Sequence, residues 1–126
     1  VRRSGQGGRR NRVRILVVDD DTRIREMTAD ALRDNGHDVE EADCGATALA
    51  LLDESISVLL TDVQMPNMTG PELADAARMR FPQLAVRFMS GDTGSIPREA
   101  FQGQAVLAKP FTISALLAAV GGSSNS

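Results

Sequence analysis

One short apolar run that ends in an acid constrains the fold of this chain more than any other feature. The run Val58-Leu59-Leu60-Thr61 leads directly into Asp62, and the turn residues Pro66 and Gly70 follow shortly afterwards. A β-branched and aliphatic run between turn signals predicts a strand that is buried on both faces, as in a parallel sheet. Asp62 then lies at the carboxyl end of this strand, where open α/β sheets bind their ligands.

A second apolar run ends in acids in the same way. Residues 14–18 read Arg-Ile-Leu-Val-Val, and Asp19, Asp20 and Asp21 come next. Apolar residues then recur at helical spacing as far as the helix stop Asn35-Gly36, and Asp20 or Asp21 is expected to cap the N-terminus of that helix. Both runs therefore place carboxylates at one edge of the predicted sheet.

Strands and helices alternate along the whole chain. We predict strands at residues 14–18, 37–42, 58–62, 84–89 and 105–108, and helices at 22–34, 45–52, 69–80 and 112–120, with one or two helical turns within 93–104. The strand at 37–42 is polar, as an edge strand would be. This alternation predicts an α/β fold with a doubly wound, five-stranded parallel sheet and helices on both faces.

Length and composition fit one domain. The chain has 126 residues, of which 42% are hydrophobic and 25% charged, which is typical of a globular protein. No apolar run approaches the roughly 20 residues of a membrane-spanning helix, and no signal peptide is visible. The single Cys44 is compatible with a reducing cytoplasm, where we expect the protein to reside.

The ends of the chain differ from the predicted domain at residues 13–120. Six of the 14 basic residues lie within residues 1–14, where there is no acid. Such a segment could bind nucleic acid, but it has no aromatic residue and no helical period, so we predict a flexible basic linker or a cloning remnant over 1–12. The Gly- and Ser-rich tail 121–126 is predicted to be disordered.

Four predicted strands end in polar groups at the same edge of the sheet. The groups are Asp19 with Asp20, then Asp62, Ser90 and Lys109, and Lys109 is the only lysine of the chain. Each alone has an ordinary explanation as a helix cap, a turn or a solvated charge. Their occurrence together at one sheet edge, however, indicates a functional site.

Three converging carboxylates would repel one another, so such a cluster usually binds a cation. Oxygen ligands favour a hard ion, and Mg²⁺ suits a site with one or two carboxylates and an open position for a phosphoryl oxygen. A carboxylate nucleophile, a divalent cation, an ammonium and a hydroxyl are the groups that phosphoryl transfer to an aspartate needs.

These residues resemble the receiver domain of two-component response regulators. The resemblance covers about residues 13–120, and its motifs are Ile15 to Asp21, Leu60 to Pro66 with Gly70, Phe88-Met89-Ser90-Gly91 and Lys109-Pro110-Phe111. It implies the flavodoxin-like receiver fold, with strand order 2-1-3-4-5.

The resemblance also implies roles for individual residues. Asp62 would accept a phosphoryl group from a histidine kinase or a histidine phosphotransfer domain. Asp20, Asp62 and the backbone carbonyl of Gln64 would bind Mg²⁺, and Asp19 would act through water. Ser90, Gly91 and Lys109 would hold the phosphoryl oxygens, and Lys109-Pro110 would be a cis peptide.

Three further positions bear on how long the phosphoryl group persists and on how the domain passes on its signal. Gln64 and Asp92, which flank the phosphoryl group in receivers, are predicted to tune its hydrolysis. Val106 stands where the family often has a Tyr or Phe that moves inward on activation, and the chain contains no Tyr at all. An aromatic switch at that position is therefore excluded, and output through another surface or action as a phosphate relay or sink stays open.

Two other classes of function compete with this interpretation. A haloacid-dehalogenase-type phosphatase would use Asp19 as its nucleophile, but it needs an acidic pair after its lysine, and residues 110–126 contain no acid. An interaction domain that is never phosphorylated would have no use for Asp20, Asp62, Ser90 and Lys109 together. We therefore favour the receiver.

The kind of protein to which this domain belongs is left open. Residues 88–91 and 109–112 resemble receivers at the C-terminal end of hybrid sensor histidine kinases, in which case the basic start would link to a kinase core, while a stand-alone regulator is the alternative. The domain itself would have at most autophosphorylation and autodephosphorylation activity. We expect no direct contact with nucleic acid or membrane, and a homodimer is left open.

Overall fold

The computed structural model describes residues 13–91, 98–101 and 106–121. The strands are β2 (Arg14–Val18), β3 (Asp38–Ala42), β4 (Val58–Asp62), β5 (Ala85–Ser90) and β6 (Val106–Ala108). The helices are α2 (Thr22–Asp34), α3 (Gly45–Leu51), α4 (Gly70–Arg80), α5 (Ile113–Gly121) and a 3-10 turn, η2 (Arg98–Phe101).

All five strands form one parallel sheet in the order β3-β2-β4-β5-β6. In chain order this is 2-1-3-4-5, so the predicted fold class and strand order are confirmed, with β3 at an edge. The order reverses between β2 and β4, which means that the carboxyl ends of these two strands border the crevice where such sheets bind ligands.

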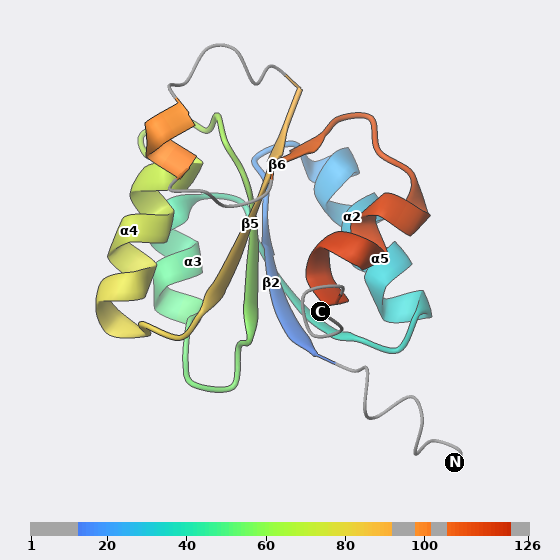
Figure 1. The fold of residues 1–126 in the computed structure, drawn as a ribbon, viewed down its shortest axis with the longest axis horizontal. Coiled ribbons are helices and arrows are strands. Elements are labelled where there is room, and N and C mark those ends of the chain that lie inside the picture. Colours follow the sequence, from blue (N-terminus) through green and yellow to red (C-terminus); the bar gives the residue numbers. More distant parts are fainter. Residues whose placement is uncertain (1–12, 92–97, 102–105, 122–126) are drawn as a thin grey trace.

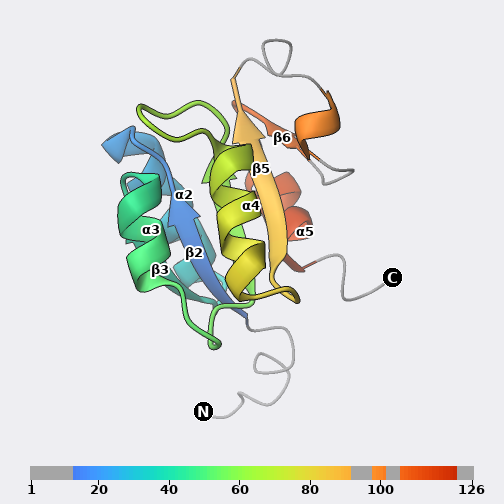
Figure 2. The ribbon, with the colours of Figure 1, turned by 90° about the vertical axis from the view of Figure 1, so that its left-hand side faces the viewer.

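Helices cover both faces of the sheet. Figure 1 views the sheet nearly along its plane and shows α3 and α4 on one side and α2 and α5 on the other. The view turned by 90° in Figure 2 shows α3 and α4 lying side by side across the strands. These four helices therefore lie on the faces of the sheet rather than over its carboxyl edge.

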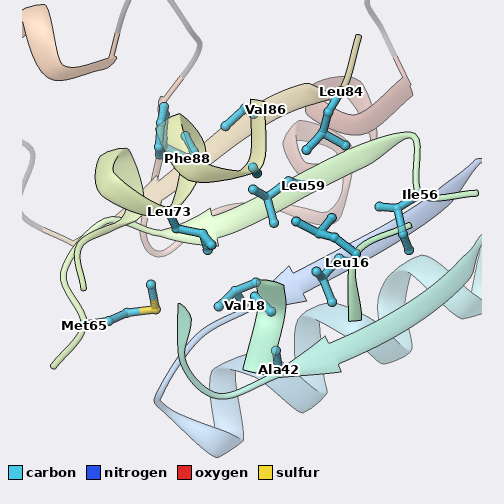
Figure 3. Packing of buried hydrophobic residues seen from close by; sticks show 14 of the residues in the cluster. Leu16, Val18, Ala42, Ile56, Leu59, Met65, Leu73, Leu84, Val86 and Phe88 are labelled. Atoms are coloured by element: carbon cyan, nitrogen blue, oxygen red, sulfur yellow. The ribbon is translucent and has the colours of Figure 1, made fainter. Parts of the chain in front are cut away.

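The central strands supply alternate side chains to two apolar clusters. Leu16, Val18 and Leu59 pack towards α3 and α4, in the cluster drawn in Figure 3. Ile15 and Leu60 point the other way and pack in the second cluster with residues of α2 and α5. Because the middle of β2 and β4 is buried on both faces, the residues at 15–18 and 58–60 are all apolar. The polar residues of these strands, Arg14, Thr61 and Asp62, lie towards the strand ends.

The helix ends follow local side-chain chemistry. The carboxylate of Asp21 caps α2 by accepting hydrogen bonds from the N–H groups of Arg23 and Ile24, at 3.0 and 3.2 Å. Gly36 ends this helix with a φ of 92°, a conformation that a residue with a Cβ adopts only at a cost. Of the two caps that the sequence left open, Asp21 is therefore the one used, which frees Asp20 for another role.

Element boundaries differ from the prediction by single residues. β5 begins at Ala85 rather than Leu84, because the Leu84 N–H donates to the Phe81 carbonyl in the preceding turn. α3 ends at Leu51, and α5 extends to Gly121. The predicted linker 1–12 and tail 122–126 lie outside the described residues, as do most of 93–104. Within the described part of the chain, no helix is both long and apolar enough to cross a bilayer.

Candidate functional site

Three carboxylates meet at the carboxyl ends of β2 and β4. Asp19 and Asp20 directly follow β2, and Asp62 is the last residue of β4. One carboxylate oxygen from each of the three lies within 4.8 Å of the others. Asp19 and Asp62 are buried, whereas Asp20 is exposed. The predicted convergence of these side chains is confirmed, and the cluster has an open side at Asp20.

Asp19 is held by four hydrogen bonds and has no solvent exposure. Its carboxylate accepts from the Asp21 N–H through Oδ1 and from Lys109 Nζ through Oδ2, both at 2.9 Å. Its backbone N–H donates to the Ala42 carbonyl at 3.1 Å, and its carbonyl accepts from Arg25 Nη1 at 2.9 Å. These partners come from the turn after β2, from β3, from α2 and from the residue after β6. Both the backbone and the carboxylate of Asp19 are therefore held in one position.

Lys109 brings the positive charge of the site. Its side chain reaches from the residue after β6 to within 2.9 Å of Asp19 Oδ2 and 3.3 Å of Asp62 Oδ1. Burial opposes its charged form, but the hydrogen bonds and charges of the two carboxylates outweigh burial and raise the pKa of Lys109. The only lysine of the chain is therefore an ammonium that bridges two buried acids.

The surroundings of Asp62 disfavour the ionised form of its carboxyl group. Burial first, and then the negative charge of Asp19, raise its pKa to about 6, although Lys109 and the Val63 N–H act in the opposite direction. The Val63 N–H donates to Oδ1 at 2.9 Å, which sets the orientation of the carboxylate. The carboxyl group is therefore buried, oriented and still mostly ionised at neutral pH.

Gly70 keeps the loop after β4 close to Asp62. The N–H of Gly70 donates to the Val63 carbonyl at 2.8 Å. A Cβ at this position would lie inside van der Waals contact with the Asp62 carbonyl oxygen and 3.0 Å from the Cα of Val63. A side chain at position 70 is therefore excluded, because the atoms that it would meet belong to the backbone of Asp62 and Val63 and cannot move aside without shifting the site.

Ser90 lies at the same edge of the sheet. It is the last residue of β5, is 2% exposed, and its carbonyl accepts a hydrogen bond from the Lys109 N–H at 2.9 Å. Asp62 pairs with Met89 in the β4–β5 register, so Ser90 is one residue beyond the level of Asp62. Gly91 follows as an exposed bend.

Four further predicted positions lie around this centre. Gln64 is exposed, two residues past Asp62. The Lys109-Pro110 peptide bond is cis, as the resemblance implies. Val106 is half-buried opposite Phe88 of β5 and packs on the α3/α4 cluster. Asp92 lies outside the described residues.

An aromatic pair lies beside Val106. The ring of Phe101 meets that of Phe88 edge to face, with centroids 5.1 Å apart and an interplanar angle of 62°. Both rings are buried. Phe88, which pairs with Val106 in the β5–β6 register, thus packs against an aromatic side chain from η2.

Arg25 is the residue near the site that sequence reasoning missed. It lies in the first turn of α2 and reaches back to the Asp19 carbonyl. Helical side chains lean towards the N-terminus of their helix, so a position one turn after the cap Asp21 could have been expected to face the end of β2.

The donor set fits a hard divalent cation. All the side-chain groups that converge are carboxylates, and two of them already share the single ammonium. Oxygen ligands with an exposed member match the preference of Mg²⁺, which retains several waters. The residues present therefore suit magnesium better than a soft metal, which would seek Cys or His ligands.

Comparison with known proteins places this geometry in a family. The family model of the response regulator receiver domain matches residues 15–121. The chain is 39% identical over 109 residues to the response regulator protein FleR of Pseudomonas aeruginosa, covering 82% of this chain and 23% of FleR. It is also 39% identical over 106 residues to the receiver protein CpdR of Brucella abortus, covering 78% of this chain and 85% of CpdR.

A sensor kinase and a solved structure are similar as well. The chain is 32% identical over 114 residues to the sensor kinase CckA of Brucella abortus, covering 84% of this chain but 12% of CckA. The structure of the chemotaxis protein CheY4 of Vibrio cholerae matches with a TM-score of 0.80 at 32% identity, covering 86% of this chain and 95% of that one. The sheet order, the acidic edge and these matches together show that the chain belongs to the response regulator receiver domain family of two-component signalling.

Proposed function

We propose that the domain accepts a phosphoryl group from a phosphohistidine onto Asp62, in a reaction that depends on Mg²⁺. The observation that carries this proposal is the placement of the Asp62 carboxylate, buried at a strand end, 3.3 Å from the only lysine and within 4.8 Å of two other acids. Asp19 shares the burial, the ammonium and the neighbouring acids, but both of its carboxylate oxygens already accept hydrogen bonds, from the Asp21 N–H and from Lys109. The contacts of Asp62 with Lys109 and with the Val63 N–H both fall on Oδ1.

Asp62 is the nucleophile in this proposal. One of its carboxylate oxygens forms a bond to phosphorus as the phosphorus–nitrogen bond of the donor breaks, and the departing imidazole takes up a proton. The reaction needs the ionised carboxylate, and a pKa of about 6 leaves Asp62 mostly ionised at neutral pH. The Val63 N–H holds the carboxylate in one orientation, which reduces the cost of aligning it with the donor.

The surrounding residues neutralise and hold the transferred group. We assign the binding of Mg²⁺ to Asp20, Asp62 and the Gln64 carbonyl, with Asp19 contacting it through water. When bound, the ion neutralises charge on the phosphoryl oxygens. Ser90 supplies a hydroxyl and Lys109 an ammonium to the same oxygens, and Gly91 leaves room beside them.

The proposed donor is a histidine kinase or a histidine phosphotransfer domain. The chain spans 23% of FleR and 12% of CckA, so activities of a longer parent protein are a separate question. The similarity to a sensor kinase supports a hybrid kinase as parent, and the similarity to CpdR, of which 85% is covered, supports a stand-alone regulator. We propose the cytoplasm as the compartment, because kinases make phosphohistidine from ATP.

Phosphorylation by a small acyl phosphate with Mg²⁺ tests the nucleophile. Intact mass should rise by one phosphoryl group in the wild type and in Asp53→Asn, an exposed acid far from the site. It should not rise in Asp62→Asn, which keeps the shape of the side chain. If Asp62→Asn gains the group at the wild-type rate, the assignment is wrong, and loss of the reaction in Asp19→Asn alone would favour the phosphatase mechanism.

Calorimetric Mg²⁺ titration tests the metal ligands. Asp20 is exposed, so Asp20→Asn should leave the fold intact, raise the melting temperature slightly by reducing repulsion, and abolish Mg²⁺ binding. Asp43→Asn, which changes another exposed acid outside the cluster, serves as the control. Unchanged affinity in Asp20→Asn would remove Asp20 from the ligand set.

A further inference from the structure

Arg25 bonds to the backbone of the acidic cluster rather than to its carboxylates. Its Nη1 donates to the Asp19 carbonyl at 2.9 Å, and its Nε donates to Glu41 Oε1 at 3.3 Å. The side chain is 14% exposed, which is low for an arginine near the surface. The guanidinium therefore connects the end of β2 to the neighbouring strand β3.

Glu41 is itself held by a second arginine. Arg33 Nη1 lies 3.0 Å from Glu41 Oε2, and Arg33 Nη2 donates to the Val39 carbonyl at 2.9 Å. Both oxygens of Glu41 thus have a guanidinium partner, one on each side. This pairing fixes Glu41, and Glu41 in turn fixes the direction in which Arg25 points.

The carbonyl that Arg25 holds belongs to the peptide unit between Asp19 and Asp20. The rotation of this unit sets the direction in which Asp20 leaves the main chain, because the carbonyl of one residue and the N–H of the next share a plane. Asp19 is fixed by its other hydrogen bonds, whereas the exposed Asp20 carboxylate makes no hydrogen bond or ion pair within the described part of the chain. Arg25 is therefore well placed to determine where the Asp20 carboxylate stands.

We infer that Arg25 is a positioning residue for the cation site, which holds the Asp19–Asp20 peptide so that Asp20 is presented to Mg²⁺. This inference rests on the proposed function, because it assumes that Asp20 is a ligand. Residues that hold metal ligands in place by hydrogen bonds commonly change metal affinity by about 10- to 100-fold when they are lost.

An electrostatic role and a positioning role for Arg25 predict opposite changes in Mg²⁺ affinity when Arg25 is replaced. Arg25 is a cation that contacts the backbone of Asp19, one member of the acidic cluster, so the loss of its charge alone should strengthen the attraction for Mg²⁺. Loss of the bond to the Asp19 carbonyl should weaken binding. The direction of the change therefore decides between a positioning role and a purely electrostatic one.

Mg²⁺ titration of Arg25→Met and Arg33→Met provides the test. Both variants remove one positive charge beside Glu41, but only Arg25 contacts Asp19. We expect Arg25→Met to bind Mg²⁺ about tenfold more weakly than the wild type, and Arg33→Met to bind at least as tightly as the wild type. Glu41→Gln keeps an oxygen acceptor for Arg25 and should stay near the wild-type affinity.

Hydrogen exchange in the Mg²⁺-free protein gives a second readout. The Asp21 N–H bonds to Asp19 Oδ1, so it should exchange faster in Arg25→Met than in Arg33→Met. If Arg25→Met does not fold, Arg25→Gln carries the same test, because its amide is too short to bridge Asp19 and Glu41.

The outcomes separate the two claims. Wild-type Mg²⁺ affinity in a folded Arg25 variant, or equal weakening in Arg33→Met, overturns the inference and leaves the proposed function standing. A wild-type protein that binds no Mg²⁺ overturns the proposed function and the inference together.

Discussion

Lys109 makes its shorter contact with Asp19, at 2.9 Å between Nζ and Oδ2, and only the longer one of 3.3 Å with Asp62. Asp19 has no solvent exposure, and the lysine side chain is 16% exposed. In the absence of a phosphoryl group, the ammonium is thus engaged chiefly in compensating a buried charge. The lysine that we assign to phosphoryl binding therefore also supports the fold.

This double role predicts a large cost for Lys109→Met. Removing one partner of a buried pair leaves an uncompensated charge, which typically costs about 3 to 5 kcal/mol. We expect the double variant Lys109→Met/Asp19→Asn to recover much of that free energy of unfolding. Urea unfolding followed by far-ultraviolet circular dichroism measures the cycle, since the chain has no Trp.

A surface pair supplies the control for this cycle. Arg33 and Asp30 are 3.6 Å apart, with side chains 43% and 73% exposed, so Asp30→Asn should change stability by no more than about 0.5 kcal/mol. If the two changes at Lys109 and Asp19 prove additive, the ion pair does not support the fold.

The raised pKa of Asp62 predicts that stability depends on pH. Burial and Asp19 raise this pKa from 3.8 to about 6, so between these two pH values the folded protein holds a proton on Asp62 that the unfolded chain releases. The resulting stabilisation is fully present below the unfolded value and is lost as the pH rises through the folded one. Asp62→Asn cannot ionise and should escape this loss.

We therefore expect Asp62→Asn to unfold at higher urea concentration than the wild type above the folded pKa of about 6. The gain should be roughly 1 to 3 kcal/mol, since one pKa unit corresponds to about 1.4 kcal/mol. It should shrink towards zero as the pH falls to 3.8. Urea midpoints across this range, with a chelator present, measure it, and a gain that is constant with pH would point to a cause other than ionisation.

Gly70→Ala should be costly because a methyl group there meets backbone on two sides, at the Asp62 carbonyl and at the Val63 Cα. We expect a loss of about 2 kcal/mol in the free energy of unfolding, as for other overpacked sites, together with weaker Mg²⁺ binding. Gly45→Ala would meet only the flexible side chain of Met68 and should cost less. Gly121→Ala enters open space and should be neutral or slightly stabilising. Equal effects at all three positions would contradict this order.

The sequence predicted those parts of the site that depend on strand ends. Asp62, Ser90 and Lys109 follow apolar runs, and in a parallel sheet such ends share one edge, so their proximity follows from topology alone. The choice of Asp21 over Asp20 as the helix cap could not be predicted, because both carry the same group and only the path of the chain after β2 separates them. Arg25 was missed because its partners, the Asp19 carbonyl and Glu41, are a backbone atom and a residue of a different strand.

The lifetime of the phosphoryl group should depend on Gln64 and Asp92, two residues past Asp62 and Ser90. Gln64 is exposed beside the site, long enough to shield the acyl phosphate from water. Asp92, which lies outside the described residues, carries a negative charge that disfavours hydroxide but can orient a neutral water by accepting its proton.

At neutral pH the attacking species is water, so we expect orientation to outweigh repulsion. Asp92→Ala should then lose phosphate several-fold more slowly than the wild type, and Gln64→Ala several-fold faster. Phosphate release from the purified phosphorylated domain, followed without a kinase, measures both rates, with Gln83→Ala at an exposed turn before β5 as the control. Faster loss in Asp92→Ala would show that repulsion dominates, and unchanged rates in both variants would show that neither side chain controls the access of water to phosphorus.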